Sequence, residues 1–387
     1  MSVPRTEDVL AALVGFDTTS RNPNLPLIEW IEAFLDVHRV PHFRAPSEDG
    51  TKANLFATIG PAGVPGIVLS GHTDVVPVDG QDWSSDPFAL TTRDGRLHGR
   101  GAADMKGFIA CCLGRVPAMV AAGLARPVHL ALSYDEEIGC VGVIGLLEEL
   151  AGRAVPIEAV IVGEPTGMGV VTAHKAKRSL RTTFTGRAAH SSLPHEGVNA
   201  VSHAARLVAR IDAIGERLAR GPGDPLYDAP HSTAHVGVMA GGTALNIVPR
   251  HAEVLHEFRV LPGEDADALV AELAAFVEDE IAPAMRATHP ECGAEMEVLM
   301  GYPGLDTPPD APVVTLAKRL AGRNDHAKVA FGTEGGRFAE ILGAPTVVIG
   351  PGSIEQAHKP DEFIEIDQLR ACETFLDRLI DHCRSAP

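Results

Sequence analysis

Apolar runs of the length of buried strands alternate with longer helical patterns over roughly the first 170 residues. The strand-like runs, in chain order, are 54–60, 66–71, 127–134 and 158–164. The helical patterns are 25–40, 106–123 and 142–152. Strands that alternate with helices in this way predict an α/β domain whose sheet is mostly parallel and is flanked by helices.

The pattern changes near Arg178, where strands with alternating polar and apolar residues begin. These strands are expected at 178–187, 231–242, 251–263 and 294–304, with amphipathic helices at 199–220 and 266–287. Alternating strands combined with two long helices predict a smaller α+β domain that has helices on one face of its sheet.

The α/β pattern returns after Pro303. Its elements are a helix at 311–322, a strand at 345–350 and a closing helix near 367–384. The smaller domain is therefore inserted into the larger one. We expect the α/β domain to comprise residues 1–177 and 293–387, and the inserted α+β domain to comprise residues 178–292.

Charge and composition exclude some classes of partner. The chain has 387 residues, a formal net charge of −18 and a pI of about 5.3, so it lacks the basic character that binds nucleic acid. No apolar run approaches the length of a membrane span, and no signal peptide is expected at the N-terminus. The six cysteines form no CxxC pair, which favours reduced thiols in a cytoplasmic protein.

Side chains that could bind a metal follow four of the strand-like runs. In chain order these are His72 with Asp74, Glu136 with Glu137, Glu164 and, after a short loop, His358. Asp104 lies between two of the strands, in a glycine-rich loop just before a helix. Since open α/β sheets bind ligands at the carboxyl ends of their strands, we expect these side chains to converge although they are far apart in sequence.

His72 and Asp74 are two residues apart in an extended segment, so they project to the same side. Asp74 could accept the second imidazole N–H of His72 and orient the ring without binding a metal itself. A single pair of this kind, or two vicinal glutamates at a helix start, is common on protein surfaces. The prediction of a metal centre depends on the whole set, which supplies two imidazoles and three carboxylates.

Five motifs, spread over nearly the whole chain, are similar to those of a known enzyme family. They are SGHTDVVP, GRGAADMKG, SYDEEIGCVG, VGEPT and GPGSIEQAHKPDE. The sequence resembles the cocatalytic dizinc amidohydrolases, the family of aminoacylases, carboxypeptidase-G2 and succinyl-diaminopimelate desuccinylases. In the inserted domain, GRAAHSSLPHEGVNA, GGTALNIVP and FRVLPGE resemble the lid or dimerisation domain of that family.

The resemblance implies two zinc ions per subunit that share one carboxylate. The ligand sets would be His72, Asp104 and Glu164 for one metal, and Asp104, Glu137 and His358 for the other. Glu136 would be the general base, Asp74 would orient His72, and the peptide bond after Asp104 is expected to be cis. Two imidazoles favour Zn²⁺ over Mg²⁺ or Mn²⁺, with Co²⁺ as a substitute.

The resemblance also implies substrate-binding residues and a partner. His190 would be the lid histidine that serves the active site of a neighbouring subunit, so a homodimer formed through the lid domain is expected. Arg259 and Asn246 resemble positions that bind the substrate carboxylate or the oxyanion. Thr333 lies in the stretch that resembles the family's substrate loop.

The implied reaction is hydrolysis of N2-acetyl-L-ornithine to L-ornithine and acetate, as in arginine biosynthesis. N-succinyl-diaminopimelate, another N-acyl amino acid or a dipeptide stays open as the substrate, because the metal centre contacts only the amide. A dinucleotide-binding oxidoreductase is disfavoured, since Asp104 stands where the third glycine of GxGxxG belongs. A metal-binding protein without activity is disfavoured because every key position matches the family pattern.

Overall fold

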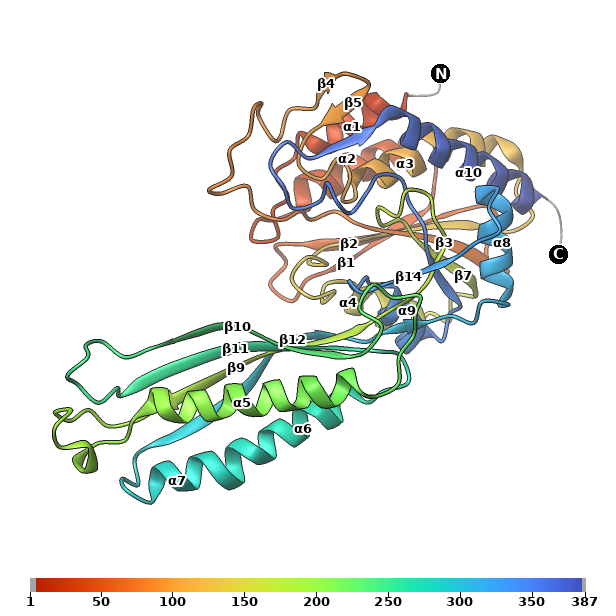
Figure 1. Ribbon diagram of the computed structural model, residues 1–387. Coiled ribbons are helices and arrows are strands. Elements are labelled where there is room, and N and C mark those ends of the chain that lie inside the picture. The colour runs from red at the N-terminus through yellow and green to blue at the C-terminus, as the bar shows by residue number, and fades with distance from the viewer. Residues whose placement is uncertain (1–4, 385–387) are drawn as a thin grey trace. The chain divides into compact units, whose positions relative to one another are not determined.

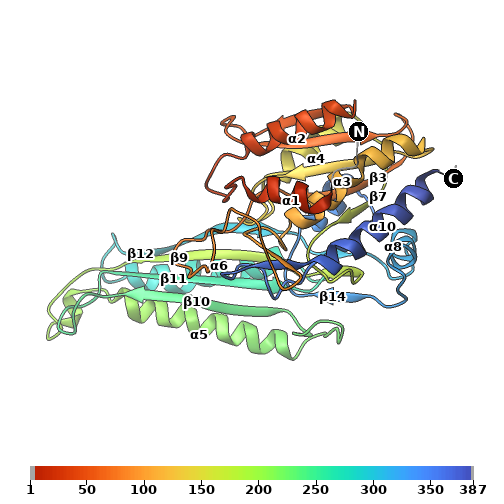
Figure 2. The ribbon, with the colours of Figure 1, turned by 90° about the horizontal axis from the view of Figure 1, so that it is seen from above.

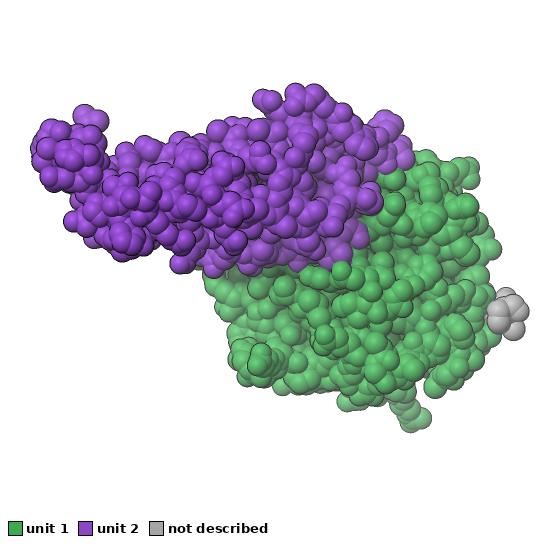
Figure 3. Space-filling view, turned by 90° about the horizontal axis from the view of Figure 1, so that it is seen from below, with its two compact units in different colours: residues 1–173, 305–328, 333–387 green, residues 174–304, 329–332 purple. Residues whose placement is uncertain are grey.

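The computed structural model describes residues 5–384, and the chain forms two compact units. Unit 1 consists of Met1–Ala173, Leu305–Lys328 and Thr333–Pro387 (Figure 3). Unit 2 consists of His174–Gly304 and Val329–Gly332. The chain leaves unit 1, builds most of unit 2 and returns, so the predicted α/β domain with a smaller inserted domain is confirmed.

Unit 1 is built on a nine-stranded mixed sheet. Its path runs through β1 (His42–Pro46), β2 (Ala53–Ile59), β6 (Val128–Ser133), β3 (Gly66–His72), β7 (Ile157–Val162), β15 (Thr346–Val348), β8 (Val171–His174) and β13 (Leu305–Asp306), with β14 (Ala327–Val329) paired to β8. The pairs β6–β3, β3–β7 and β7–β15 are parallel, whereas β1–β2, β2–β6 and β15–β8 are antiparallel. The predicted parallel sheet therefore forms the centre, where β3 and β6 are buried along their whole length.

Helices cover both faces of this sheet (Figure 1). They are α1 (Thr6–Val14), α2 (Leu25–Val37), α3 (Lys106–Ala122), α4 (Val143–Gly152), α8 (Pro312–Ala321), α9 (Gly335–Leu342) and α10 (Ile366–Arg384). The apolar sides of α1, α2, α3, α8 and α10 share one core with the sheet, while α4 and α9 contact each other on the opposite face. This two-sided cover explains why the central strands read as continuous apolar runs.

A small three-stranded sheet links distant parts of unit 1. It consists of β16 (Phe363–Glu365), β5 (Arg96–His98) and β4 (Thr91–Arg93), in that order. β16 pairs antiparallel with β5, so the segment after His358 lies beside the glycine-rich loop that carries Asp104.

Unit 2 is a four-stranded antiparallel sheet with its helices on one face (Figures 1 and 2). The strand order is β10 (Thr233–Gly241), β11 (His251–Val260), β9 (Ala176–Thr185) and β12 (Gly293–Tyr302). The helices are α5 (Ala200–Ala219), α6 (Ala266–Phe276) and α7 (Ala282–Arg286), with a π-helical turn, η2 (Val277–Ile281), between α6 and α7 and a 3₁₀ turn, η1 (Pro194–Glu196), before α5. Every second residue of β11 is buried, as its polar–apolar alternation predicts.

The boundary of the smaller unit differs from the expected one. β12 pairs with β9 from Gly293, opposite Thr185, to Tyr302, opposite Lys177. Residues 293–304 therefore belong to unit 2 and not to the α/β unit. The alternating pattern of residues 294–304 already matched the strands of the smaller domain, so the expected boundary at residue 293 excluded a strand that belongs to it.

Two further sequence predictions concern the chain as a whole. All six cysteines are buried and free of disulfide bonds, in agreement with the predicted reduced thiols. Among the helices found between residues 5 and 384, none combines the length and the apolar character that crossing a membrane requires.

Candidate metal centre and active site

The five predicted metal ligands meet in unit 1, near the carboxyl ends of the central strands. His72 is the last residue of β3, and its Nε2 lies 3.0 Å from Oδ1 of Asp104 and 3.8 Å from Oε1 of Glu164. The Nε2 of His358 lies 3.1 Å from Oε2 of Glu137 and 3.4 Å from Oδ2 of Asp104. Asp104 thus presents one carboxylate oxygen to each histidine, which is the arrangement expected of a carboxylate that bridges two cations.

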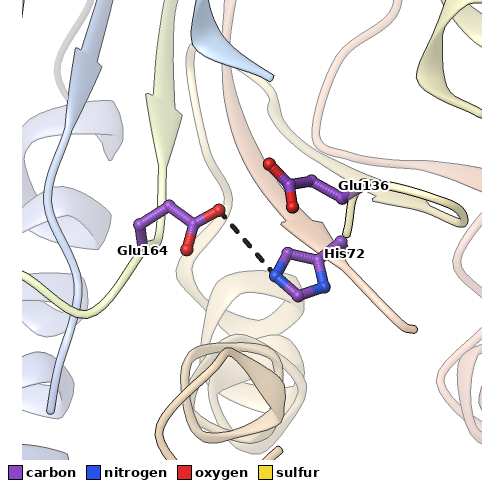
Figure 4. A group of neighbouring side chains, drawn as sticks. All are labelled: His72, Glu136 and Glu164. Atoms are coloured by element: carbon purple, nitrogen blue, oxygen red, sulfur yellow. Dashed lines mark ion pairs between the residues drawn. The ribbon is translucent and has the colours of Figure 1, made fainter. Parts of the chain in front are cut away.

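Glu136 lies in the same cluster. One ligand atom each from His72, Glu136 and Glu164 lie within 4.8 Å of one another, and the same is true of His72, Asp104 and Glu137. Figure 4 shows the His72 imidazole facing the Glu164 carboxylate, with Glu136 nearby. Because Glu136 shares a group of potential ligand atoms with His72 and Glu164, its role as a base and not a ligand stays a prediction.

Asp74 supports the cluster in a way that the sequence predicted only in part. The Nδ1 of His72 lies 2.9 Å from the backbone carbonyl oxygen of Asp74 and 3.6 Å from its carboxylate. The backbone of Asp74 therefore accepts the hydrogen bond that we expected its side chain to accept, and Nε2 faces the cluster. The carboxylate accepts instead from the backbone N–H groups of Glu136 and Glu137, at 3.1 and 3.3 Å. It also accepts from the Ser20 hydroxyl at 2.7 Å.

A glycine allows close packing beside one of the predicted ligands. Gly163 follows β7 and precedes Glu164, and a Cβ added at Gly163 would lie 2.0 Å from the Phe108 ring of α3. Any side chain here would collide with that ring and force it to shift. The peptide bond between Asp104 and Met105 is cis, as predicted.

Burial and charge shift the proton affinities of the cluster. Burial raises the pKa of Glu136 to about 8 and that of Glu137 to about 7, and neighbouring carboxylates add to both shifts. Burial likewise raises the pKa of Glu164. At Asp104 burial acts in the same direction, but hydrogen bonds from the two histidines outweigh it and hold the pKa below its usual value. Hydrogen bonds to Asp104 and Glu137 raise the pKa of His358 to about 10.

The donor set fits two divalent cations of the zinc type. Imidazole nitrogens combined with carboxylate oxygens are ligands that Zn²⁺ prefers, and a catalytic zinc site keeps about three protein ligands. Cations at this place would also offset the repulsion between carboxylates that raises the pKa values of Glu137 and Glu164. The side chain of His358 is 53% exposed, so the cluster has a side that a substrate can reach.

The structure adds two buried acidic residues that the sequence analysis did not single out. Glu334, just before α9, accepts hydrogen bonds from the hydroxyls of Ser70 and Ser133 in β3 and β6. The two serines are the sequence signal that could have indicated a buried acceptor such as Glu334, because a hydroxyl in a buried apolar strand needs a hydrogen-bond partner. Glu362, in the HKPDE motif, accepts from the backbone N–H of Asp104.

Three predicted active-site residues belong to unit 2. His190 and Asn246 are exposed, and His190 forms a β-bridge with Ile247, so the structure places His190 and Asn246 on adjacent segments. Arg259 of β11 is half-buried and donates a hydrogen bond to the Tyr302 hydroxyl at 3.2 Å. The roles of these three residues in substrate binding stay predictions.

Thr333, predicted in the substrate loop, lies in unit 1 and is fully buried. Its hydroxyl accepts a hydrogen bond from the Gly335 N–H at 3.0 Å, at the start of α9. The side chain is therefore occupied by a local contact with the backbone. This burial argues against direct contact between the Thr333 side chain and a substrate.

The fold and the His–carboxylate cluster at the strand ends agree with the comparisons with known proteins, which identify this chain as an amidohydrolase. It belongs to peptidase family M20/M25/M40, whose family model matches residues 68–382. The resemblance seen in the five motifs is thereby confirmed.

Two relatives of similar length share one name. The acetylornithine deacetylase of Myxococcus xanthus is 35% identical over 386 residues, which cover 98% of this chain and 98% of the relative. The acetylornithine deacetylase of Proteus mirabilis (strain HI4320) is 33% identical over 362 residues, which cover 92% of this chain and 88% of the relative.

Solved structures share the fold over nearly the whole chain. An M20 family metallo-carboxypeptidase from Sulfolobus solfataricus, Sso-CP2, has a TM-score of 0.79 at 18% identity and covers 98% of this chain and 99% of its own. Aminopeptidase PepT from Bacillus cereus ATCC 10987 has a TM-score of 0.75 at 23% identity, with 100% of both chains covered. The YXEP protein of Bacillus subtilis, a dinuclear metal binding peptidase of family M20, has a TM-score of 0.69 at 16% identity and covers 99% of this chain and 98% of its own.

Proposed function

We propose that this chain hydrolyses N2-acetyl-L-ornithine to L-ornithine and acetate, a step of arginine biosynthesis. The observation that carries the proposal is the convergence of two histidines and two glutamates around Asp104 in unit 1. The choice of substrate is supported by relatives with that substrate in their name, which match nearly the full length of this chain.

The proposed cofactors are two Zn²⁺ ions per subunit, with Co²⁺ as a working substitute. The proposed ligand sets are His72, Asp104 and Glu164 for one ion, and Asp104, Glu137 and His358 for the other. Bound cations of this kind lower the pKa of a water molecule and polarise an amide carbonyl. The two oxygens of Asp104, each directed at a different histidine, support its role as the shared ligand.

Glu136 is the proposed general base and acid. It takes a proton from the attacking water and returns that proton to the departing α-amine. Burial raises its pKa to about 8, and cation charge nearby would bring that value towards neutral pH, where a group gains and loses a proton at little cost. The hydrogen bond from the Glu136 N–H to Asp74 holds the loop that presents this carboxylate.

The proposed substrate contacts come from unit 2. Arg259 would bind the substrate carboxylate, and His190 and Asn246 would stabilise the oxyanion that forms during attack. The hydrogen bond from Arg259 to Tyr302 supports a fixed guanidinium, which recognises a carboxylate better than a mobile one. The burial of Thr333 and its hydrogen bond from Gly335 support a structural role, in which this side chain shapes the loop before α9.

The proposed assembly is a cytoplasmic homodimer that forms through unit 2, with His190 serving the active site of the other copy. β10 is an edge strand of the unit 2 sheet, and its exposed residues include Val238 and Met239. An edge strand with exposed apolar side chains is a surface that a second copy would cover.

The test of the proposed reaction is kcat/KM on a panel of substrates. The panel comprises N2-acetyl-L-ornithine, other N-acetyl amino acids, N-succinyl-diaminopimelate and a dipeptide, each with Zn²⁺ or Co²⁺. We expect N2-acetyl-L-ornithine to be preferred by at least about tenfold. A preference for another substrate would reassign the specificity, and failure of the zinc-loaded protein to cleave any of them would contradict the proposed reaction.

A further inference from the structure

Arg100 and Glu362 form a buried ion pair beside the candidate metal centre. Both side chains are 1% exposed, and Nη1 of Arg100 lies 2.6 Å from Oε2 of Glu362. The proposed mechanism gives this pair no part. A buried ion pair adds little net stability, because the loss of hydration offsets the attraction between the charges, so the contacts that the pair makes are more informative.

The second oxygen of Glu362 holds the backbone of Asp104. Its Oε1 accepts hydrogen bonds from the N–H groups of Ala103 and Asp104, at 2.9 and 3.1 Å. Two bonds to successive N–H groups fix the stretch of backbone from which the Asp104 side chain extends. The position of the proposed bridging carboxylate therefore depends on a residue 258 positions further along the chain.

The guanidinium of Arg100 is connected to the backbone of His358. Nη2 of Arg100 donates to Oε1 of Gln81 at 2.6 Å, and Nε2 of Gln81 donates to the carbonyl oxygen of His358 at 3.0 Å. His358 has a φ of +64°, a conformation that residues other than glycine keep only where surrounding contacts hold them. The guanidinium also lies 5.0 Å from the centre of the Trp83 ring, which restricts its movement.

We propose that the Arg100–Glu362 pair, together with Gln81, positions Asp104 and His358 at the spacing that the second metal ion needs. The inference rests on the proposed metal ligands. Arg100 and Glu362 are outside the proposed ligand sets and act through the backbones of Asp104 and His358, so they are positioning residues. Groups that orient metal ligands through hydrogen bonds typically change metal affinity by about 10–100-fold when they are removed.

The experiment measures zinc affinity and stoichiometry by competition with a chelator, for the wild type, Glu362→Gln and Gln81→Ala. Glu362→Gln retains the shape of the side chain but loses the charge that pairs with Arg100. We expect it to weaken binding of zinc by about 10–100-fold. Gln81→Ala removes the link between Arg100 and His358 but leaves the bonds from Glu362 to the Asp104 backbone, so one zinc equivalent should weaken and the other should keep its wild-type affinity. Excess zinc should restore kcat in both variants, with KM unchanged.

Arg115→Met is the matched control. Arg115 lies 3.4 Å from Glu373 in an ion pair between α3 and α10, in the same unit and on elements that bear no proposed ligand. We expect it to lower the unfolding midpoint without changing zinc affinity.

Wild-type zinc affinity in both Glu362→Gln and Gln81→Ala would overturn the proposed positioning role. Gln81 is partly exposed, so Gln81→Ala keeps the test valid if Glu362→Gln fails to fold. A wild-type protein that binds fewer than two zinc ions would instead overturn the proposed metal centre itself, which distinguishes the two failures.

Discussion

The vicinal residues Glu136 and Glu137 illustrate how neighbouring side chains of one type can differ in chemistry. The Glu137 carboxylate lies 3.1 Å from the His358 imidazole. The Glu136 carboxylate lies 3.1 Å from the Cys140 thiol, which donates to it. Glu137 lies beside His358, another predicted ligand, and this supports metal binding by Glu137. Glu136 lies beside the Cys140 thiol, which is only a weak hydrogen-bond donor, and this supports proton transfer by Glu136.

Replacing Glu136 by Gln separates these two roles. Glutamine keeps the shape of the side chain but cannot accept a proton from water, so we expect kcat to fall by about 10²–10⁴-fold. Zinc content, measured by atomic emission, should stay at the wild-type value. Glu149→Gln on α4 is the control and should leave both quantities unchanged. Loss of a zinc ion from Glu136→Gln would reassign Glu136 as a ligand.

Two buried histidines predict how stability depends on pH. Burial lowers the pKa of His129 and of His256 to about 4, below the value of about 6.5 expected in the unfolded chain. Between these values the unfolded chain binds a proton that the folded chain does not, so stability is lost as pH falls from about 6.5 to about 4. Each histidine should account for about 3 kcal/mol of unfolding free energy over this range.

Urea unfolding of the metal-free protein at pH 7 and pH 4.5 measures this effect. His256→Gln should show a loss of unfolding free energy on acidification that is about 2–3 kcal/mol smaller than in the wild type. His235→Gln, at an exposed position of β10, should show the wild-type loss. If His256→Gln loses as much unfolding free energy between pH 7 and pH 4.5 as the wild type does, His256 is not the cause of that loss.

The convergence of the five proposed ligands could be predicted from the sequence, because each follows an apolar run or lies in a glycine-rich loop. The contacts that orient them could not. The backbone carbonyl of Asp74, and not its side chain, accepts from His72, and Glu334 joins serines from two strands. Such bonds depend on the exact path of the folded chain, and residue types do not specify that path.

Among the secondary-structure elements, the central strands were the most predictable. β3 and β7 end within about two residues of their expected ends, because a polar residue at the end of a buried apolar run is a strong local signal. The helix expected at 266–287 is interrupted by the π-helical turn η2. A change of helix type of this kind depends on packing against the sheet, which the apolar periodicity does not reveal.

Gly163→Ala tests the close contact between β7 and α3. The added Cβ would lie 2.0 Å from the Phe108 ring, so we expect the unfolding free energy to fall by about 1–3 kcal/mol and zinc affinity to fall with it. Gly145→Ala in α4 is the control, since an added Cβ there meets no atom within 4 Å. It should raise stability by up to about 1 kcal/mol, because alanine favours a helix. If Gly163→Ala has the unfolding free energy of the wild type, the Phe108 ring moves aside without loss of stability.

For the chain as a unit, the insertion of one domain into another could be predicted because the α/β pattern stops and resumes. The pairing of β12 with β9 could not, because it joins segments more than 100 residues apart. Assembly into a dimer depends on a second copy of the chain, so one sequence predicts it only through resemblance to a family. A direct test is therefore needed.

Mixtures of two inactive variants provide that test. If His190 serves the active site of the other copy, a dimer of one Glu136→Gln chain and one His190→Ala chain contains one complete site. Random pairing should then restore up to about a quarter of wild-type activity, since about half of the dimers are mixed and each has one site. The two variants assayed separately provide the baseline. No gain on mixing, with exchange of chains verified, would place His190 in its own subunit's site or in none.

The points at which the chain enters and leaves the insertion lie next to each other. A Cβ added at Gly304 would lie 3.0 Å from the carbonyl oxygen of His174, and Tyr302 stands opposite Lys177 in the ladder of β9 and β12. Unit 1 can therefore be closed by a tight turn of a few residues in place of 175–303, with no stretching of the host backbone. The shortened chain would keep all five proposed metal ligands and lose His190, Asn246 and Arg259 together, so one shorter polypeptide would test what the inserted domain contributes.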